Sequence, residues 1–381
     1  MRYAIAGAGF TGAVIARALA EAGHKVLVVD ERLHVAGNSH TARDPETGVM
    51  THIYGPHIFH TANERVWNYV QRFAVMRRYQ HRVRAIAANG SNYGLPVNLT
   101  TINQFFGTSL GPEEARAFIQ SKALKIAHPA NFEEQALSMI GPELYQAFFR
   151  GYTLKQWGAE PTELPASIFR RLPLRFTADD TYYDHPHQAI PEAGYTALVS
   201  GILDHSNIEL RLGVKFEELT EEFSHVIYSG PIDRYFHYDL GRLNYRTLDF
   251  EVFRAEGTHQ NTSVVNYCAE QVPYTRITEH KHFAPWEAES FAKTICYREF
   301  SRACGPRDIP YYPIRFAGEE TLLKSYIERA PATKGVSFAG RLGSFRYIDM
   351  DVSIAEALAA ADTILDRIRA GAQIPAFFIE P

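Results

Sequence analysis

The first thirty residues show three successive patterns of apolar positions. Arg2–Ala6 is a short apolar run typical of a buried strand. Ala13–Ala22 places apolar residues at helical spacing and is followed by Gly23, a residue favoured just after the end of a helix. Val26–Val29 is rich in β-branched residues and predicts a buried parallel strand that ends at Asp30. The N-terminus therefore predicts a strand–helix–strand unit.

Helical spacing dominates from about residue 62 to residue 151. The helices predicted there are Asn63–Phe73, Pro112–Ile126, Phe132–Ile140 and Pro142–Arg150. Residues 153–183, by contrast, are rich in aromatic residues, Arg and Pro, which indicates a functional loop more than a packed element. Gly194–Leu203 again predicts a helix, and Ile208–Leu212 predicts a strand.

The C-terminal part combines both kinds of pattern. Alternating stretches between Tyr245 and Tyr297 predict antiparallel strands. Val336–Ala339 predicts another strand, and Asp351–Arg369 predicts a long amphipathic helix. We therefore expect an α/β fold with a Rossmann-like domain, an inserted helical domain and an antiparallel β-sheet domain. The expected ranges are 1–61, 190–242 and 331–381 for the first, 62–151 for the second, and 152–189 with 243–330 for the third.

Three glycines stand at the turn between the first strand and the first helix. Gly7, Gly9 and Gly12 have the Gly-x-Gly-x-x-Gly spacing, and Asp30 follows 18 residues after the last of them. Glycine lets the backbone turn tightly and approach a pyrophosphate, while the helix N-terminus offers free N–H groups to that anion. A carboxylate at Asp30 can accept hydrogen bonds from ribose hydroxyls. In this full context the motif predicts dinucleotide binding.

The acid at Asp30 disfavours NADP but does not separate NAD from FAD. The stretch Glu31–Asn38 resembles the extension of the cofactor cradle in glutathione-reductase-like and amine-oxidase-like FAD proteins. Gly340-Arg341 before the last helix stands where such proteins approach the flavin ring. The chain has no second dinucleotide fingerprint and no paired redox cysteines, which argues against a pyridine-nucleotide disulfide reductase. We therefore expect the Rossmann-like domain to bind FAD.

Composition narrows the class of partner. The net charge of -4 gives no electrostatic case for binding nucleic acid or an acidic membrane, whereas Arg170, Arg171 and Arg175 form a local cluster suited to a small anion. No apolar run approaches the ~20 residues of a membrane span. Because a strand begins at once, with no charged lead and no cleavable apolar region, we expect no secretion signal. Three cysteines without a Cys-x-x-Cys pair predict neither a disulfide framework nor a zinc ribbon, and favour the cytoplasm.

Several longer motifs then point to one family. They are Tyr54–Thr61, Gly151–Gly158, Ile190–Thr196, Tyr228–Asp233, Pro273–His280 and Tyr347–Met350. In this order, from the first strand to the last helix, they resemble the bacterial UDP-galactopyranose mutases. Because several long motifs agree in register over nearly the whole chain, the resemblance is more specific than the glycine fingerprint alone.

The resemblance implies the reversible conversion of UDP-galactopyranose to UDP-galactofuranose. This reaction has no net redox change but requires reduced FAD: flavin N5 attacks the anomeric carbon, UDP leaves, the sugar ring opens and recloses through another hydroxyl, and UDP returns. The resemblance also implies a homodimer and an external electron donor for the flavin. It implies no nucleic-acid partner and no membrane insertion.

On the substrate side, the resemblance assigns Arg171 and Arg276 to the diphosphate, where a guanidinium can fork onto phosphate oxygens as UDP leaves. It assigns Tyr152 to stacking on uracil and Trp157 to a wall near the sugar. Core packing is the rival explanation for Tyr152, which follows Phe148-Phe149 at a predicted helix end. Further substrate-side residues are Phe148, Phe149, Tyr182, Asn266, Tyr312, Tyr347 and Asp349, with the choice between Tyr311 and Tyr312 left open.

On the cofactor side, His57 and His60 have the His-x-x-His spacing of a metal site, but no third ligand stands near, and we expect no metal. The resemblance places them beside the flavin, where His57 could position the ring or a sugar hydroxyl. Arg246 and Arg341 would stabilise the reduced flavin anion. The remaining expected cofactor residues are Gly7, Gly9, Phe10, Thr11, Gly12, Asp30, Glu31, Arg32, Gly37, Asn38, Ile58, Gly230, Gly340, Asp349 and Met350.

Two departures from the family pattern and two rival functions remain. His81 stands where an Asn is expected, and Ala36 replaces a frequent glycine.

A flavin oxidase of the amine-oxidase type would share the N-terminal fold but would not explain Arg171 and Arg276 in diphosphate motifs. A non-catalytic sensor of nucleotide sugars would bind UDP without turnover.

Overall fold

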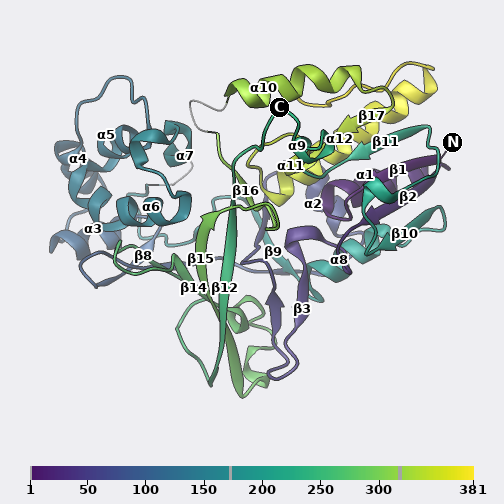
Figure 1. Ribbon diagram of the computed structural model, residues 1–381. Helices are drawn as coiled ribbons and strands as arrows, with labels where there is room; N and C mark the ends of the chain where they lie inside the picture. The colour runs from purple at the N-terminus through teal and green to yellow at the C-terminus, as the bar shows by residue number, and fades with distance from the viewer. Residues whose placement is uncertain (1, 171–173, 316–319) are drawn as a thin grey trace.

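The computed structural model describes residues 2–170, 174–315 and 320–381 (Figure 1). A parallel five-stranded sheet forms one end of the molecule, in the order β10-β2-β1-β11-β17. Helix α1 packs on α8 and α12, and their apolar faces form one core with the sheet. The elements are β1 (Arg2–Ala6), β2 (Lys25–Asp30), β10 (Ile208–Leu212), β11 (His225–Tyr228), β17 (Val336–Phe338), α1 (Phe10–Glu21), α8 (Gly194–Leu203) and α12 (Met350–Arg369).

A seven-stranded sheet crosses the middle of the molecule, in the order β16-β12-β15-β14-β13-β7-β8. All of its pairs are antiparallel except β13 with β7. The register places Arg276 between Asn266 on β13 and Glu299 on β15. The strands are β7 (Val83–Ile86), β8 (Asn92–Leu95), β12 (Tyr245–Glu256), β13 (Val264–Tyr267), β14 (Arg276–Glu279), β15 (Lys293–Ala303) and β16 (Tyr312–Pro313).

Helices gather at the other end of the molecule, at the left of Figure 1. They share a second core with β7, β8 and β13. Helix α5 contains a break at Gly141 (φ 77°), and a π-helical turn over Tyr145–Arg150 leads directly into α6. The helices are α3 (Leu99–Phe106), α4 (Pro112–Lys122), α5 (Phe132–Leu144), α6 (Gly151–Trp157) and α7 (Ala166–Arg170).

Short elements connect these parts. The short strands form a three-stranded sheet in the order β5-β9-β6 and a hairpin of β3 and β4. Strands β3 and β9 contact α8, and β4 contacts the 3-10 turn His280–Phe283. Helix α2 packs on α12. The bounds are β3 (Thr41–Arg43), β4 (Met50–His52), β5 (Phe59–Thr61), β6 (Met76–Arg78), β9 (His187–Pro191), α2 (Glu64–Val70), α9 (Ile232–Tyr235), α10 (Glu320–Arg329) and α11 (Gly340–Gly343).

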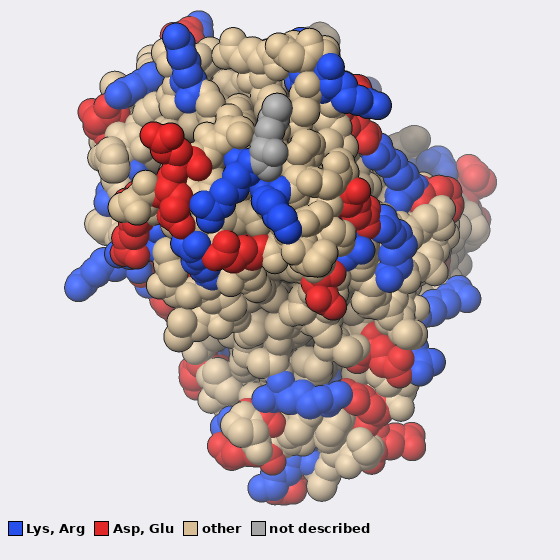
Figure 2. All heavy atoms as spheres, turned by 90° about the vertical axis from the view of Figure 1, so that its right-hand side faces the viewer, with Lys and Arg blue, Asp and Glu red and all other residues tan. Residues whose placement is uncertain are grey.

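The exposed edge of the parallel sheet carries mixed charge. Figure 2 views the molecule from the side where β1, β2 and β10 lie in Figure 1, and Lys and Arg side chains there alternate with Asp and Glu. On the edge strand β10, Arg211 pairs with Glu209 and Glu221 at 2.7 Å each, and Arg2 lies 3.6 Å from Glu209. Such exposed pairs add little stability, but charge on an edge strand discourages pairing with another chain.

The predicted strand–helix–strand unit is confirmed by β1, α1 and β2, and the break between two helices at Gly141 is confirmed as well. Two predictions of local structure are wrong. Residues 76–95 contain the strands β6, β7 and β8. Strand β7 pairs with β13 in the large sheet, and its short alternating pattern at Val83–Ile86 buries every second side chain. Residues 153–183 are only partly loop, since α6 and α7 pack their apolar residues into the helical core.

Among the residues that the structure describes, no helix combines the length and the apolar character needed to cross a membrane.

Replacing Gly12 tests the close packing of α1 on β1. A Cβ atom at Gly12 would lie 2.0 Å from the carbonyl oxygen of Gly7 and 3.0 Å from Ile5. We expect Gly12→Ala to lower the free energy of unfolding by about 1–3 kcal/mol, the usual effect of overpacking. Urea unfolding of the apoprotein measures this, with Gly9→Ala as the matched control, since a Cβ there meets nothing nearer than 4.0 Å. Equal stability of the two variants would contradict the packing described.

Candidate functional site

A cleft of about 960 Å³ opens at the carboxyl ends of β1, β2 and β11. The turn from β1 to α1 forms its floor, the stretch 30–39 forms one wall, and residues 304–310 and 340–342 complete it. Ligands of open parallel sheets bind at this place because loops and helix N-termini converge there. The cleft is therefore the candidate site for the dinucleotide that the glycine fingerprint predicts.

The glycines of the β1–α1 turn have different tasks. Gly7 has φ +110°, and a Cβ there would lie 2.1 Å from Ser229 Oγ, so only glycine fits between the strand ends. Gly9 is the N-cap of α1 without a side-chain cap, and it faces the cleft. The first N–H groups of α1 and the open space beside Gly9 together form a cradle for an anion.

Acidic and basic side chains line the wall of the cleft. Asp30 accepts hydrogen bonds from the backbone N–H groups of Ala8 and Arg32, both at 2.9 Å, which ties the end of β2 to the glycine turn. Glu31 binds Arg234 through both carboxylate oxygens at 2.8 and 2.9 Å. These pairs fix the rim at the end of β2 where a ribose is expected.

Arg32, next to Asp30 and Glu31, has a hydrogen-bond donor that no protein atom satisfies. It donates to Asn38 Oδ1 at 2.8 Å and lies over the ring of Tyr54, 4.7 Å from its centroid. Its Nη1 is buried and has no hydrogen-bond partner in the protein, although the residue lines the cleft. A buried guanidinium N–H without a partner is costly, so the site fits an anionic or carbonyl-bearing ligand.

His57 and Arg341 lie at the other end of the cleft. Burial lowers the pKa of His57 to about 4, so the imidazole is neutral at pH 7. Its Nδ1 lies 2.8 Å from the carbonyl oxygen of Gly55. Because that oxygen can only accept, Nδ1 carries the proton and Nε2 is left as an acceptor. Arg341 donates to the carbonyl oxygens of Ile348 and Tyr311, which holds it across this end of the cleft.

A polar cluster on the seven-stranded sheet surrounds Arg276. Its Nη2 donates to the hydroxyl of Tyr152 at 2.6 Å, and its Nε lies 3.1 Å from Glu299 Oε1. Glu299 is only 1% exposed. Burial is the largest single effect on the pKa of Arg276 and acts to lower it. Glu299 and the neighbouring Tyr152, Tyr312 and Tyr182 together outweigh burial and raise that pKa, so the guanidinium stays charged. Sequence reasoning missed Glu299, which belongs to no motif.

Aromatic rings form the walls around this cluster. The ring centroids of Trp157 and Tyr347 are 6.1 Å apart, and those of Tyr347 and Tyr312 are 5.4 Å apart. Arg341 lies over Tyr347 at 5.3 Å, which connects the rings to the end of the cleft at His57. Tyr182 is close enough to Arg276 for the guanidinium charge to act against the rise that burial causes in the tyrosine pKa.

The structure separates the two neighbouring tyrosines Tyr311 and Tyr312. Tyr312 faces Trp157 and Tyr347, whereas the ring of Tyr311 lies 6.3 Å from that of Tyr54. Tyr312 is therefore the ring of the pair that joins the cluster around Arg276.

Most of the expected cofactor residues line one cleft. They are Gly7, Gly9, Phe10, Thr11, Asp30, Glu31, Arg32, Gly37, Asn38, His57, Gly230, Gly340, Arg341 and Met350. The expected substrate residues Tyr152, Trp157, Tyr182, Arg276, Tyr312 and Tyr347 form the adjoining cluster, with Asn266 beside Arg276 in the sheet register. Arg171 lies outside the described residues.

Other expected residues lie further from the cleft. Phe148 is 2% exposed and packs on Tyr93 and Phe105 in the helical core. Arg246 is buried beneath α6, where its Nε donates to the carbonyl oxygen of Gln156 and to Ser301 Oγ at 3.1 Å each. Gly12, Ile58, His60, Phe149 and Asp349 do not line the cleft, although Asp349 acts electrostatically on both His57 and His60.

The contacts of His60 are with a second histidine and a tyrosine ring, not with the set of ligands that a metal ion requires. Its Nδ1 lies 2.8 Å from Nδ1 of His185, and its ring stacks on Tyr183 at 3.7 Å. Within the described residues, no group of three or more His, Cys, Asp or Glu side chains could hold a metal ion.

Lys155 is a second residue that sequence reasoning missed. Its Nζ donates to the carbonyl oxygens of Tyr267, Ala269 and Tyr274 at 2.6, 2.9 and 2.9 Å. It thereby joins α6, which carries Tyr152, to the turn before Arg276. No motif of charge spacing would have identified it, since its partners are backbone carbonyls.

Comparisons with known proteins agree with this geometry. The family model of the NAD(P)-binding Rossmann-like domain matches residues 5–73, and that of UDP-galactopyranose mutase matches residues 147–347. A probable UDP-galactopyranose mutase of Klebsiella pneumoniae is 55% identical over 98% of this chain and 97% of its own. A dTDP-fucopyranose mutase of Escherichia coli is 49% identical over 94% and 96%. A solved structure of reduced UDP-galactopyranose mutase superposes with a TM-score of 0.75 at 16% identity, covering 96% of this chain and 95% of that one.

The parallel sheet, its glycine turn and the match over residues 5–73 define a protein with a Rossmann-like dinucleotide-binding domain, as the sequence predicts. The chain belongs to the UDP-galactopyranose mutase family. It is accordingly a mutase, an isomerase of this family, and the expected α/β fold with a helical insertion and a mostly antiparallel sheet is confirmed.

Gly9→Ala separates cofactor binding from folding. A methyl group at this position has its nearest protein atom, the Cα of Gly37, at 4.0 Å, and Gly9 faces the cradle at the start of α1. We expect the variant to unfold at the wild-type urea concentration and to lose most of its bound flavin, because close approach of the backbone to a pyrophosphate requires glycine. Absorbance of the purified protein near the flavin bands measures the loss. Wild-type flavin content would show that the pyrophosphate lies elsewhere.

Proposed function

We propose that the protein is a UDP-galactopyranose mutase that interconverts UDP-galactopyranose and UDP-galactofuranose with reduced FAD. The observation that carries this proposal is the charged Arg276, enclosed by tyrosine hydroxyls, next to the end of a dinucleotide cleft. Such a chamber suits a leaving diphosphate better than a cationic amine or an apolar substrate of a flavin oxidase.

The residues of the cleft fit FAD. Its volume of about 960 Å³ is that of a site for a large cofactor. The cradle beside Gly9 would hold the pyrophosphate, and the unpartnered Nη1 of Arg32 would donate to it or to the adenosine part. His57 and Arg341 would hold the isoalloxazine end. Reduced FAD would supply a nucleophilic nitrogen for the anomeric carbon.

The remaining chemistry belongs to the chain. Arg276 holds and neutralises the diphosphate while its bond to the sugar breaks. Tyr182, Tyr312 and Tyr347 donate hydroxyl hydrogen bonds to the same oxygens. Burial raises the pKa of Tyr182 and of Tyr312, so both hydroxyls remain protonated donors at neutral pH. The neutral His57, with Nε2 as acceptor, can receive a sugar hydroxyl or a flavin N–H.

The nucleobase end of the substrate lies toward α6 in this proposal. Tyr152 offers its ring face to uracil while its hydroxyl is held by Arg276. Trp157 forms the wall near the sugar. Arg171 supplies a second charge to the diphosphate, a homodimer is the working form, and an external donor keeps the flavin reduced.

The relative from Escherichia coli makes dTDP-fucopyranose the alternative substrate. Both substrates carry a nucleoside diphosphate on a pyranose, so Arg276 and the tyrosines serve either one. They differ at the base, at the ribose and at the sugar C6, and a direct comparison of turnover decides between them.

Turnover should depend on the redox state of the flavin. We expect purified protein reduced with dithionite to convert UDP-galactofuranose to UDP-galactopyranose, and air-oxidised protein to convert none, because only reduced flavin has a nucleophilic N5. Anion-exchange chromatography of the nucleotide sugars measures both reactions. dTDP-fucofuranose is run in parallel, and we expect at least tenfold lower kcat/KM for it, about 1.4 kcal/mol.

Four outcomes would contradict this. Conversion by the oxidised protein would remove the role of reduced flavin. Preference for dTDP-fucofuranose would reassign the substrate. UDP binding without conversion in either state would favour a sensor, and oxygen consumption with an amine would favour an oxidase.

A further inference from the structure

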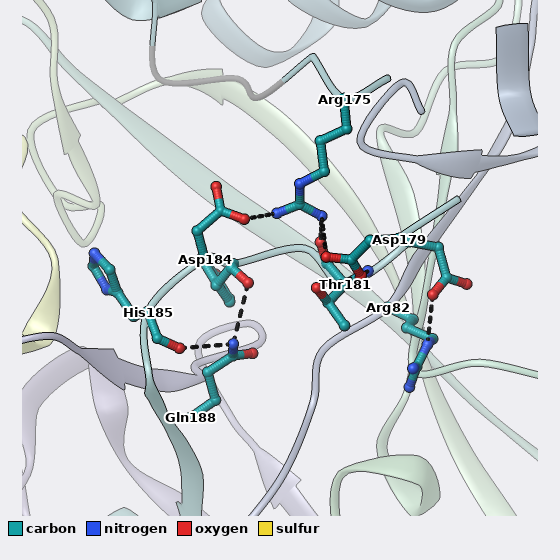
Figure 3. Close-up of polar contacts among 9 residues, drawn as sticks. Arg82, Arg175, Asp179, Thr181, Asp184, His185 and Gln188 are labelled. Atoms are coloured by element: carbon teal, nitrogen blue, oxygen red, sulfur yellow. Dashed lines mark hydrogen bonds and ion pairs between the residues drawn. The ribbon is translucent and has the colours of Figure 1, made fainter. Parts of the chain in front are cut away.

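A buried arginine fastens the loop that carries Tyr182. The side chain of Arg175 is 10% exposed. Its Nη1 donates to the carbonyl oxygen of Thr181, and its Nη2 donates to the carboxylate of Asp184 (Figure 3). Asp179 lies 3.7 Å from Nη1. All three partners belong to residues 179–184, so one guanidinium closes this short loop upon itself. We call Arg175, Asp179, Thr181 and Asp184 the Arg175 clamp.

The loop has no regular secondary structure, and a small number of individual contacts fix its shape. Residues 175–186 contain no helix or strand, so no ladder of backbone hydrogen bonds holds them. Before the loop, the backbone N–H of Arg175 donates to the carbonyl oxygen of Val97 at 2.9 Å. After it, Gln188 on β9 donates to the carbonyl oxygens of Tyr183 and His185 at 3.1 and 2.9 Å (Figure 3). Between these two ends, the backbone N–H of Leu99 donates to the carbonyl oxygen of Thr177 at 3.0 Å, and Thr181 donates to Asp179 Oδ1 from its N–H and its hydroxyl at 3.0 and 2.8 Å. The clamp adds the connection from Arg175, at the start of the loop, to residues 179–184.

The tyrosines in the middle of the loop reach the site. The backbone N–H of Tyr182 donates to the carbonyl oxygen of His81 at 2.7 Å, and its ring meets the ring of His81 edge-on at 5.6 Å. Tyr183 stacks on His60. The side chain of Tyr182 thus lies near Arg276, Tyr347 and Asp349, which act electrostatically on its hydroxyl. The position of this hydroxyl therefore depends on the bond to His81 and on the flanking backbone at Thr181 and Asp184, which the clamp holds.

The burial pattern separates this role from a general contribution to folding. Asp184 is 69% exposed and Asp179 is 49% exposed, so both carboxylates remain hydrated when Arg175 is replaced. Loss of the guanidinium consequently leaves no buried unpaired charge, which is the usual reason that breaking such a pair unfolds a protein. The replacement removes the restraint that Arg175 places on the backbone at Thr181 and Asp184.

We propose that Arg175 is a positioning residue: it holds residues 179–184 so that the Tyr182 hydroxyl meets the diphosphate bound at Arg276. This inference rests on the proposed function, since it takes the ligand at Arg276 to be a nucleoside diphosphate. Arg175 does not touch that ligand in this proposal and acts through the loop alone.

The test measures UDP affinity and steady-state turnover on the flavin-loaded enzyme. For Arg175→Met we expect Kd for UDP and KM to rise about tenfold, with a smaller change in kcat, the effect of a misplaced binding group. The melting temperature and flavin content should equal those of wild type. Arg175→Lys should restore part of the affinity, because an ammonium can still reach one acceptor. Asp184→Asn, at an exposed position, should weaken UDP binding in the same direction.

Arg82→Met is the matched control. Arg82 donates to Asp180 on the same loop at 2.8 Å, but this pair is 50% and 45% exposed, and its loss should leave Kd unchanged (Figure 3). A double-mutant cycle adds a sharper test. If Arg175 acts through Tyr182, Arg175→Met should have little further effect on Kd in a Tyr182→Phe background.

Failure of the clamp and failure of the proposed function give different results. A wild type that binds UDP, with Arg175→Met equal to it in Kd, or with full additivity in the cycle, would overturn the clamp alone. A wild type that binds no UDP would overturn the proposed function and the ligand assigned here. Chymotryptic cleavage at Tyr182 and Tyr183, expected to be faster in Arg175→Met, reports the loop restraint without any nucleotide.

Discussion

The ion pair between Arg276 and Glu299 is the interaction on which the site depends. Both side chains point from neighbouring strands of one sheet, 3.1 Å apart, and Glu299 is almost without solvent contact. Removing two charges from water is costly and is offset only when each has its partner and further hydrogen bonds. Tyr152 and Thr275 provide those bonds, to Arg276 and Glu299 respectively. The pair is thus held as a charged unit before any ligand arrives.

The rest of the fold brings the cleft of the Rossmann-like domain toward this pair. The parallel sheet places the turn of Gly7 and Gly9 at one end of a cleft, and the 340–350 region carries Arg341 and Tyr347 from there toward Arg276. Lys155 joins α6 to the turn before Arg276, which fixes Tyr152 and Trp157 relative to the charge. Two sheets with separate cores therefore share one site, as a reaction between a bound cofactor and a bound nucleotide sugar requires.

Sequence could predict what local chemistry determines. The spacing of Gly7, Gly9 and Gly12 follows from one tight turn, and the structure has that turn. The predicted helices Phe132–Ile140 and Pro142–Arg150 leave a break at Gly141, where the structure has a φ of 77°. The strands at 83–95 were missed because four-residue strands carry too short a pattern. Glu299 and Lys155 were given no role, and Arg175 was expected only as part of a cluster for a small anion, because the roles of these residues arise only when distant segments meet. Phe148 shows the same aromatic pattern whether it lines a core or a pocket.

The claim that Arg276 holds the diphosphate is tested most directly by calorimetric titration of two ligands, UDP and uridine. The variant is Arg276→Met combined with Glu299→Gln, since the single change would leave Glu299 buried and unpaired. We expect the flavin-loaded double variant to bind UDP at least tenfold more weakly than wild type, because charge-assisted hydrogen bonds to phosphate are lost. The loss of affinity for uridine should be smaller, because uridine depends on Arg276 only through the Tyr152 ring that the guanidinium holds. Equal loss for both ligands, or no loss for UDP, would contradict the assignment.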